Sequence, residues 1–238
     1  MKLPTCPLAL PLLILLCTPF AAHAECEGPP QPSVLVKVDA APVPQDRLLS
    51  LAMLSKLPSE SRRAGMEDYD HTLGMTEADF GTRNELELVT VDDGAGGYCS
   101  TVQSATITLI WKSKIHLASE IVPGSCLDKE IIIHEQKHVE IDRTLIPVAL
   151  RAIEVSVTEV AREGVKGSSV ADAEQALKTK ISDSVEEALD IFSVVRKRKQ
   201  LAHDSPEEYD SLSKTCGIME YLRLLRDSAL GITPPAQP

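Results

Sequence analysis

Hydrophobic residues recur with two different periods along the chain, and the period changes near residue 125. Before that point, apolar and polar residues alternate in short runs, which is typical of strands. The runs cover 33–39, 85–91, 102–111 and 115–121. Residues 73–76 begin a strand-rich block, and the glycine-rich sequence at 92–97 predicts a hairpin turn within it. The pattern over 45–56 predicts one short amphipathic helix.

Apolar residues spaced three and four apart predict two long helices in the second part of the chain. The first runs from 126 to about 163 and contains Pro147, which we expect to kink or split it. The second runs from 170 to 202, after a turn at 164–169. The serine and proline at 205–206 predict the start of a last helix. The apolar faces of the long helices indicate that they pack as an antiparallel hairpin.

This order of elements predicts a fold of the α+β class. The chain is expected to begin with a cleaved signal peptide, because Lys2 precedes a short apolar core and Ala22-His23-Ala24 fits a cleavage site. The expected division is a signal peptide at 1–24, a single domain at 25–226 with a β-rich half at 25–125 and a helical half at 126–226, and a flexible tail at 227–238.

The composition excludes some classes of partner. The chain has 24 Lys and Arg against 35 Asp and Glu, a formal net charge of −11. An acidic protein is repelled by nucleic acid and by anionic membranes, so we expect no nucleic-acid partner. Beyond the signal peptide no segment is apolar enough to span a membrane, so stable membrane insertion is not expected.

Four cysteines remain after the expected cleavage, and an even number in an exported protein predicts disulfides. Three pairings are open. Cys99 and Cys126 flank the strand region just before the first long helix, which favours Cys99–Cys126. That choice leaves Cys26–Cys216, which would tie the N-terminal segment to the C-terminal helix.

The first long helix carries His134-Glu135-x-x-His138. Two histidines four residues apart lie on one helical face and can bind Zn²⁺, while the glutamate between them works as a general base on a metal-activated water. Three isoleucines before His134 place this motif on a buried helix. The alternative is a solvated helical face with two incidental histidines.

A catalytic zinc needs a third protein ligand, which must come from farther along the chain. If the long helices fold back near residue 166, the end of the second helix lies level with His134, given a rise of about 1.5 Å per residue. Asp204 is the preferred ligand and His203 is its rival. Asp142, one turn beyond His138, is expected to accept a hydrogen bond from the His138 ring. Tyr209 is a candidate hydrogen-bond donor to an oxyanion, although ordinary packing is the favoured interpretation of a tyrosine there.

These motifs resemble the bacterial secreted zinc peptidases catalogued as domain of unknown function 922. The resemblance rests on Val34–Val38, Leu48–Leu54, Gly74-Met75-Thr76, His134-Glu135-Gln136-Lys137-His138 and Gln200–Asp204, and it spans most of the mature chain. Three positions depart from the family pattern. His203 stands where the family often has tyrosine, Glu140 where it often has aspartate, and Tyr209 about where a late histidine is expected.

The expected function is that of an exported, zincin-like zinc metallopeptidase, located in the periplasm or outside the cell. One catalytic Zn²⁺ would be the cofactor, and the substrate would be a peptide or protein, with cell-wall peptide as one option. The competing hypothesis is a non-catalytic envelope protein that uses its helical hairpin as an interaction surface and holds a structural or vestigial metal.

Overall fold

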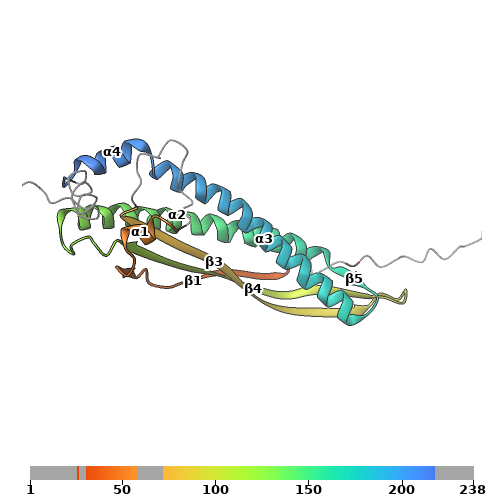
Figure 1. Ribbon diagram of the computed structural model, residues 1–238. Helices are drawn as coiled ribbons and strands as arrows, with labels where there is room; N and C mark the ends of the chain where they lie inside the picture. Colours follow the sequence, from red (N-terminus) through yellow and green to blue (C-terminus); the bar gives the residue numbers. More distant parts are fainter. Residues whose placement is uncertain (1–25, 27–30, 58–71, 218–238) are drawn as a thin grey trace, which may run out of the picture.

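The computed structural model describes residue 26 and the ranges 31–57 and 72–217, without the side chains of Tyr209, Asp210 and Ser213. The signal peptide and the tail expected from the sequence lie outside these residues. In chain order the elements are β1 (Ser33–Ala40), β2 (Gln45–Asp46), α1 (Leu51–Leu54), β3 (Gly74–Asp92), β4 (Tyr98–Leu117), α2 (Cys126–Glu163), β5 (Val165–Gly167), α3 (Val170–His203) and α4 (Pro206–Lys214). Helices α2 and α3 lie along one face of an elongated sheet (Figure 1).

The central strand of the sheet is β4. Strand β3 pairs with it antiparallel over its whole length, and β5 pairs antiparallel with its first residues. Strands β1 and β2 pair with it parallel, so the sheet is mixed and the prediction of an antiparallel β-rich half is wrong for these two strands. The chain reverses direction before β3 and again after it, which leaves β1 and β4 pointing the same way.

Two boundaries within the β-rich half differ from the prediction. The run predicted at 102–111 and the first residues of the run predicted at 115–121 belong to one continuous strand, because buried residues such as Trp111 and Ile115 continue on the helix-facing side through the polar residues between them. The strand ends at Leu117, so the prediction is wrong for 118–121. The predicted helix at 45–56 is helical only over Leu51–Leu54. It starts there because Ser50 caps it, its hydroxyl accepting from the Met53 N–H, while Gln45 and Asp46 pair with β4.

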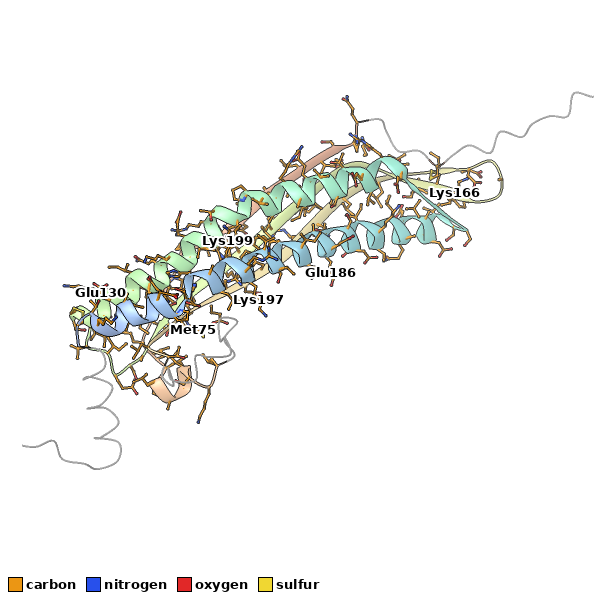
Figure 2. All side chains as sticks on the ribbon, turned by 90° about the horizontal axis from the view of Figure 1, so that it is seen from above. Met75, Glu130, Lys166, Glu186, Lys197 and Lys199 are labelled. Carbon is orange, nitrogen blue, oxygen red and sulfur yellow. A yellow bond between two sulfur atoms is a disulfide. The ribbon has the colours of Figure 1, made fainter. Side chains whose placement is uncertain are left out.

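Serine caps set the start of both long helices. The Ser125 hydroxyl accepts from the Asp128 N–H at the start of α2, and the Ser169 hydroxyl accepts from the Asp172 N–H at the start of α3. Contacts between the helices run in opposite order along the two sequences, because Asp142 pairs with Arg196 and Glu163 pairs with Lys180. Figure 2 shows the two helices side by side above the sheet.

Helix α2 continues through Pro147, so the predicted split does not occur. Pro147 lies on the exposed side, while Ile146 and Ala149 beside it are buried in the core. Packing of the buried face on both sides of the proline holds the helix together where its backbone lacks a donor. None of the helices in the described ranges combines the length and the apolar character that a membrane span requires.

The core forms between the helices and the face of the sheet that they cover. Strand β4 supplies Ile107, Leu109 and Ile115, which are almost fully buried. Ile153 of α2 and Ile181 of α3 pack in the same layer. Burying large aliphatic side chains from both helices against one strand stabilises the fold by roughly 1.5–3 kcal/mol for each of them. The core therefore fixes α2 relative to the sheet.

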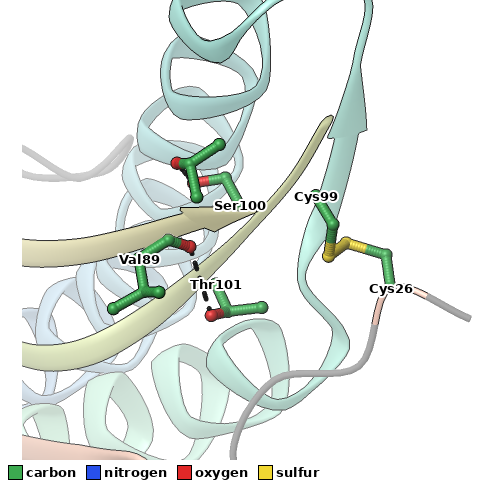
Figure 3. The surroundings of a disulfide bond; sticks show 6 residues. Cys26, Val89, Cys99, Ser100 and Thr101 are labelled. Carbon is green, nitrogen blue, oxygen red and sulfur yellow. Dashed lines mark hydrogen bonds between the residues drawn. A yellow bond between two sulfur atoms is a disulfide. The ribbon is translucent and has the colours of Figure 1, made fainter. Parts of the chain in front are cut away.

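Both predicted disulfide pairings are wrong. The structure joins Cys26 to Cys99 and Cys126 to Cys216. Cys99 stands near the beginning of β4 and Cys126 comes after its end, so the length of an extended strand, roughly 60 Å at the usual rise per residue, separates the two. Figure 3 shows Cys26 reaching Cys99 beside Thr101, whose hydroxyl donates to the Val89 carbonyl.

Candidate metal centre

Helix α2 brings His134 and His138 together one turn apart on its inner face. Their Nε2 atoms are 3.3 Å apart, and the side chains are among the buried polar groups of the protein. The helix can bury them there because Ile131 and Val139 on the neighbouring positions pack into the core. Two imidazole nitrogens are thus directed at one point between α2 and the end of α3.

Asp204 is brought to the same point by the end of α3. It is the residue that closes this helix, its backbone N–H donating to the Gln200 carbonyl. Its Oδ1 lies 3.2 Å from His134 Nε2 and 2.9 Å from His138 Nε2, and only 1% of the residue is exposed. The end of the second long helix was predicted to lie level with His134, and the structure puts Asp204 in direct contact with both histidines.

His203 lies beside this group. Its ring stacks on that of His134 with centroids 4.5 Å apart, and its Nε2 faces the His134 backbone carbonyl at 3.3 Å. His134, His138 and His203 each offer a nitrogen, and these atoms all lie within 4.8 Å of one another, so the three could together hold a metal ion. Burial and the charges of the other two histidines lower the pKa of His203, which keeps it neutral.

A second layer of side chains orients His138. The Gln200 Oε1 lies 2.5 Å from His138 Nδ1, and the Gln200 amide nitrogen donates to the His138 carbonyl at 3.1 Å and to Asp142 Oδ1 at 2.7 Å. Arg196 in turn donates to both oxygens of Asp142. Asp142 was predicted to contact the His138 ring directly, but Gln200 lies between them. Because the amide nitrogen faces Asp142, its oxygen must face His138.

This arrangement controls the protonation of His138. With Nδ1 donating to Gln200, Nε2 is left to face the other site atoms, which is the tautomer a metal ligand needs. Burial disfavours the charged imidazole, but the hydrogen bond to Asp204 and the charge of Glu135 outweigh burial and raise the pKa of His138 to about 9. Asp204 therefore favours the positively charged form of the His138 imidazole.

Glu135 lies next to the histidines and is 4% exposed. Burial raises its pKa, although the charges of His138 and His134 and a hydrogen bond from Thr76 oppose that rise. The Thr76 hydroxyl lies 2.8 Å from Glu135 Oε2 and 3.0 Å from the Glu135 backbone oxygen. A buried carboxylate with a raised pKa has the proton affinity that a general base requires near neutral pH.

Helix α4 extends over the same end of the molecule. The Glu208 carboxylate lies 3.1 Å from Lys137 Nζ and 3.9 Å from His134 Nδ1. The hydrogen bond from Lys137 lowers the pKa of Glu208, which keeps it ionised. Tyr209 belongs to this helix, but its side chain lies outside the described residues, so the structure does not test it as an oxyanion donor.

The donor set fits zinc. Ligands held at 2.0–2.1 Å in a tetrahedron are separated by about 3.3 Å. The three distances that join His134 Nε2, His138 Nε2 and Asp204 Oδ1 are 3.3, 3.2 and 2.9 Å, so these atoms already have nearly the spacing of zinc ligands. Imidazole and carboxylate groups are also the ligand types found in catalytic zinc sites.

Several residues of this site were not found from the sequence as contributors to it. Gln200 and Arg196 stand four and eight residues before Asp204, so the four-residue spacing along α3 was the available signal. Arg196 lies in a run of four basic residues, a pattern typical of a solvated face, but its side chain is largely buried against Asp142. Thr76 belongs to a distant strand, and no local pattern connects it with Glu135.

Comparisons with known proteins provide no relative from which a role could be transferred. No family model matches the chain, and neither a curated protein nor a solved structure matches it. The roles of the site residues therefore rest on their geometry.

Proposed function

We propose that the protein is a zinc-dependent hydrolase of the metallopeptidase type, with His134, His138 and Asp204 as metal ligands and Glu135 as general base. The observation that carries this proposal is the spacing of the three ligand atoms, which approaches that of a tetrahedral zinc site. A buried carboxylate adjacent in sequence to the first ligand completes the set that metal-assisted hydrolysis requires.

When bound, zinc would supply Lewis-acid chemistry, lowering the pKa of water to about 7 and polarising a carbonyl group. Glu135 would take a proton from the attacking water and hand it to the leaving amine. Gln200 would hold the His138 ring in the tautomer that binds metal, and Asp142 and Arg196 would hold Gln200.

A peptide or protein is the proposed substrate, with cell-wall peptide included, because amide hydrolysis uses a water activated in this way. We propose that the protein works outside the cytoplasm, in the periplasm or the extracellular space. The disulfides support that location, because such bridges form and persist in oxidising compartments.

Metal analysis and a Glu135→Gln variant test the function. The purified protein should contain about one zinc per chain, and Glu135→Gln should keep the metal and lose hydrolysis of a mixed peptide library. Glu140→Gln is the matched control, since Glu140 lies on the same helix with an exposed side chain. Zinc-free protein, or full activity in Glu135→Gln, would contradict the proposal.

One observation favours a second function, a non-catalytic envelope protein with a structural metal. The site residues are largely buried, and His203 is a fourth potential ligand beside them. A structural zinc is closed by four protein ligands, whereas a catalytic zinc keeps one position open. X-ray absorption of the zinc-loaded protein distinguishes the two: three protein ligands and one light-atom ligand from solvent support the hydrolase, and three histidines with one carboxylate support the structural site.

A further inference from the structure

The beginning of β3 contacts the proposed base directly. Thr76 is the third residue of this strand, and Glu135 lies one turn after Ile131 on α2. The Thr76 hydroxyl reaches Glu135 Oε2 at 2.8 Å as well as the backbone oxygen of the same residue. Figure 2 shows Met75, the neighbour of Thr76, at the end of the molecule where α2 begins. Strand and helix are therefore joined at the residue that carries the proposed chemistry.

Gly74 makes this approach feasible. A Cβ atom at position 74 would lie 2.5 Å from Ile131 Cγ2 and 2.9 Å from Glu135 Oε1. Ile131 is 5% exposed and packed in the core, so it cannot move away easily. A glycine fits here because the side chains of Ile131 and Glu135 occupy the space that a Cβ atom would fill.

A purely structural role for Thr76 would need only its contact with the Glu135 backbone oxygen, which ties the strand to the helix. The contact with Oε2 does something further, because it restricts the rotation of a buried carboxylate. A buried carboxylate that lacks hydrogen bonds is costly, and the Thr76 hydroxyl is a neutral donor that holds it without removing its capacity to accept a proton.

We infer that Thr76 is a positioning residue for Glu135, and that Gly74 leaves the room in which Thr76 places the carboxylate. This inference rests on the proposed function, in which Glu135 is the base. It assigns the start of β3 a role in the reaction: the metal ligands all come from the helical part, whereas the orientation of the base comes from the sheet.

Three variants test the inference. Thr76→Val keeps the shape and removes the hydroxyl, Thr76→Ser keeps the hydroxyl, and Gly74→Ala pushes against Glu135. Thr82→Val is the matched control, because Thr82 is an exposed threonine on the same strand. Two measurements are made on each: kcat and KM for the peptide library with zinc bound, and the chemical shift of the Glu135 carboxyl carbon in metal-free protein labelled with ¹³C-glutamate. Glu135→Gln assigns that signal.

We expect Thr76→Val to lower kcat on the order of 100-fold, the effect of a misplaced reacting group, with KM and zinc content unchanged. The Glu135 carbon signal should move in Thr76→Val and in Gly74→Ala, and should stay near its wild-type position in Thr76→Ser and Thr82→Val. Thr76→Ser should also restore kcat.

An unmoved Glu135 signal in Thr76→Val would overturn the inference, and so would an unchanged kcat. Failure of the proposed function has a different signature, which is an inactive wild-type protein or an active Glu135→Gln. In that case the carbon signal still decides whether Thr76 holds the carboxylate. If Thr76→Val does not fold, Thr76→Ala removes the same hydroxyl, and its Glu135 carbon signal answers the same question.

Discussion

Gln200 contacts His138 at two places, its Oε1 lying 2.5 Å from Nδ1 of the ring and its amide nitrogen 3.1 Å from the backbone carbonyl. The second contact fixes the first, because an amide that donates to a carbonyl and to Asp142 can offer only its oxygen to the ring. Residues that orient a metal ligand in this way usually matter nearly as much as the ligand itself.

We therefore predict that Gln200→Ala lowers the zinc affinity by about 10–100-fold, the usual cost of removing a partner that orients a ligand. Competition with a chromophoric chelator measures that affinity. Gln175→Ala is the control, since Gln175 is an exposed glutamine on the same helix. Equal affinities in the two variants would remove Gln200 from the metal site.

The choice between Asp204 and His203 as third ligand is open to direct measurement. Asp204→Asn should weaken zinc binding by more than the roughly 100-fold that an outer partner costs at most, because Asp204 Oδ1 already has the spacing of a ligand atom. His203→Asn should weaken it by less than about tenfold if His203 only packs on His134. The opposite order would identify His203 as the ligand.

Loss of Arg196 should destabilise the protein independently of metal. Its guanidinium donates to both oxygens of Asp142, whose side chain is fully buried. Removing one partner of a buried ion pair costs about 3–5 kcal/mol, so Arg196→Ala should lose that much in urea denaturation of the metal-free protein. Arg198→Ala, at an exposed position on the same helix, should change little. The double variant Arg196→Met, Asp142→Leu should recover most of the loss.

Replacing Pro147 should stabilise the protein, in contrast to the loss of Arg196. An interior proline is roughly 3 kcal/mol less favourable than alanine in a helix, and Pro147 is exposed within the continuous helix α2. Pro147→Ala should therefore raise the free energy of unfolding, by up to about 3 kcal/mol. A thermal unfolding midpoint at or below that of the wild type would show that the helix has adapted to the proline.

The disulfide at the metal end should have a local effect that the other disulfide lacks. Cys126–Cys216 ties the start of α2 to the chain just after α4, whose Glu208 lies near His134. In the double variant Cys126→Ser, Cys216→Ser, amide hydrogen exchange in α4 should be faster. In Cys26→Ser, Cys99→Ser it should be unchanged, although each pair of changes should cost about 2–4 kcal/mol of stability. Equal hydrogen exchange of α4 in both variants would contradict a local effect of the Cys126–Cys216 disulfide on this helix.

Local sequence patterns were sufficient to predict part of the secondary structure. The spacing of apolar residues predicted the positions of α2 and α3, and the alternating runs predicted strand structure within β1, β3 and β4. The direction of pairing was not predictable locally, because whether β1 runs parallel to β4 depends on how often the chain reverses between them. The contacts that Thr76 and Gln200 make with the site were not predictable for a similar reason, since they span 59 and 62 residues.

The order of the disulfides has a consequence for how the protein is made. Cys26 pairs with Cys99 and Cys126 with Cys216, so the first cysteine after the expected cleavage site pairs with the second, the third pairs with the fourth, and the two covalent loops do not overlap. A chain that enters an oxidising compartment N-terminus first would meet each correct partner before any wrong one. Native oxidation of this protein should therefore need little help from a disulfide isomerase.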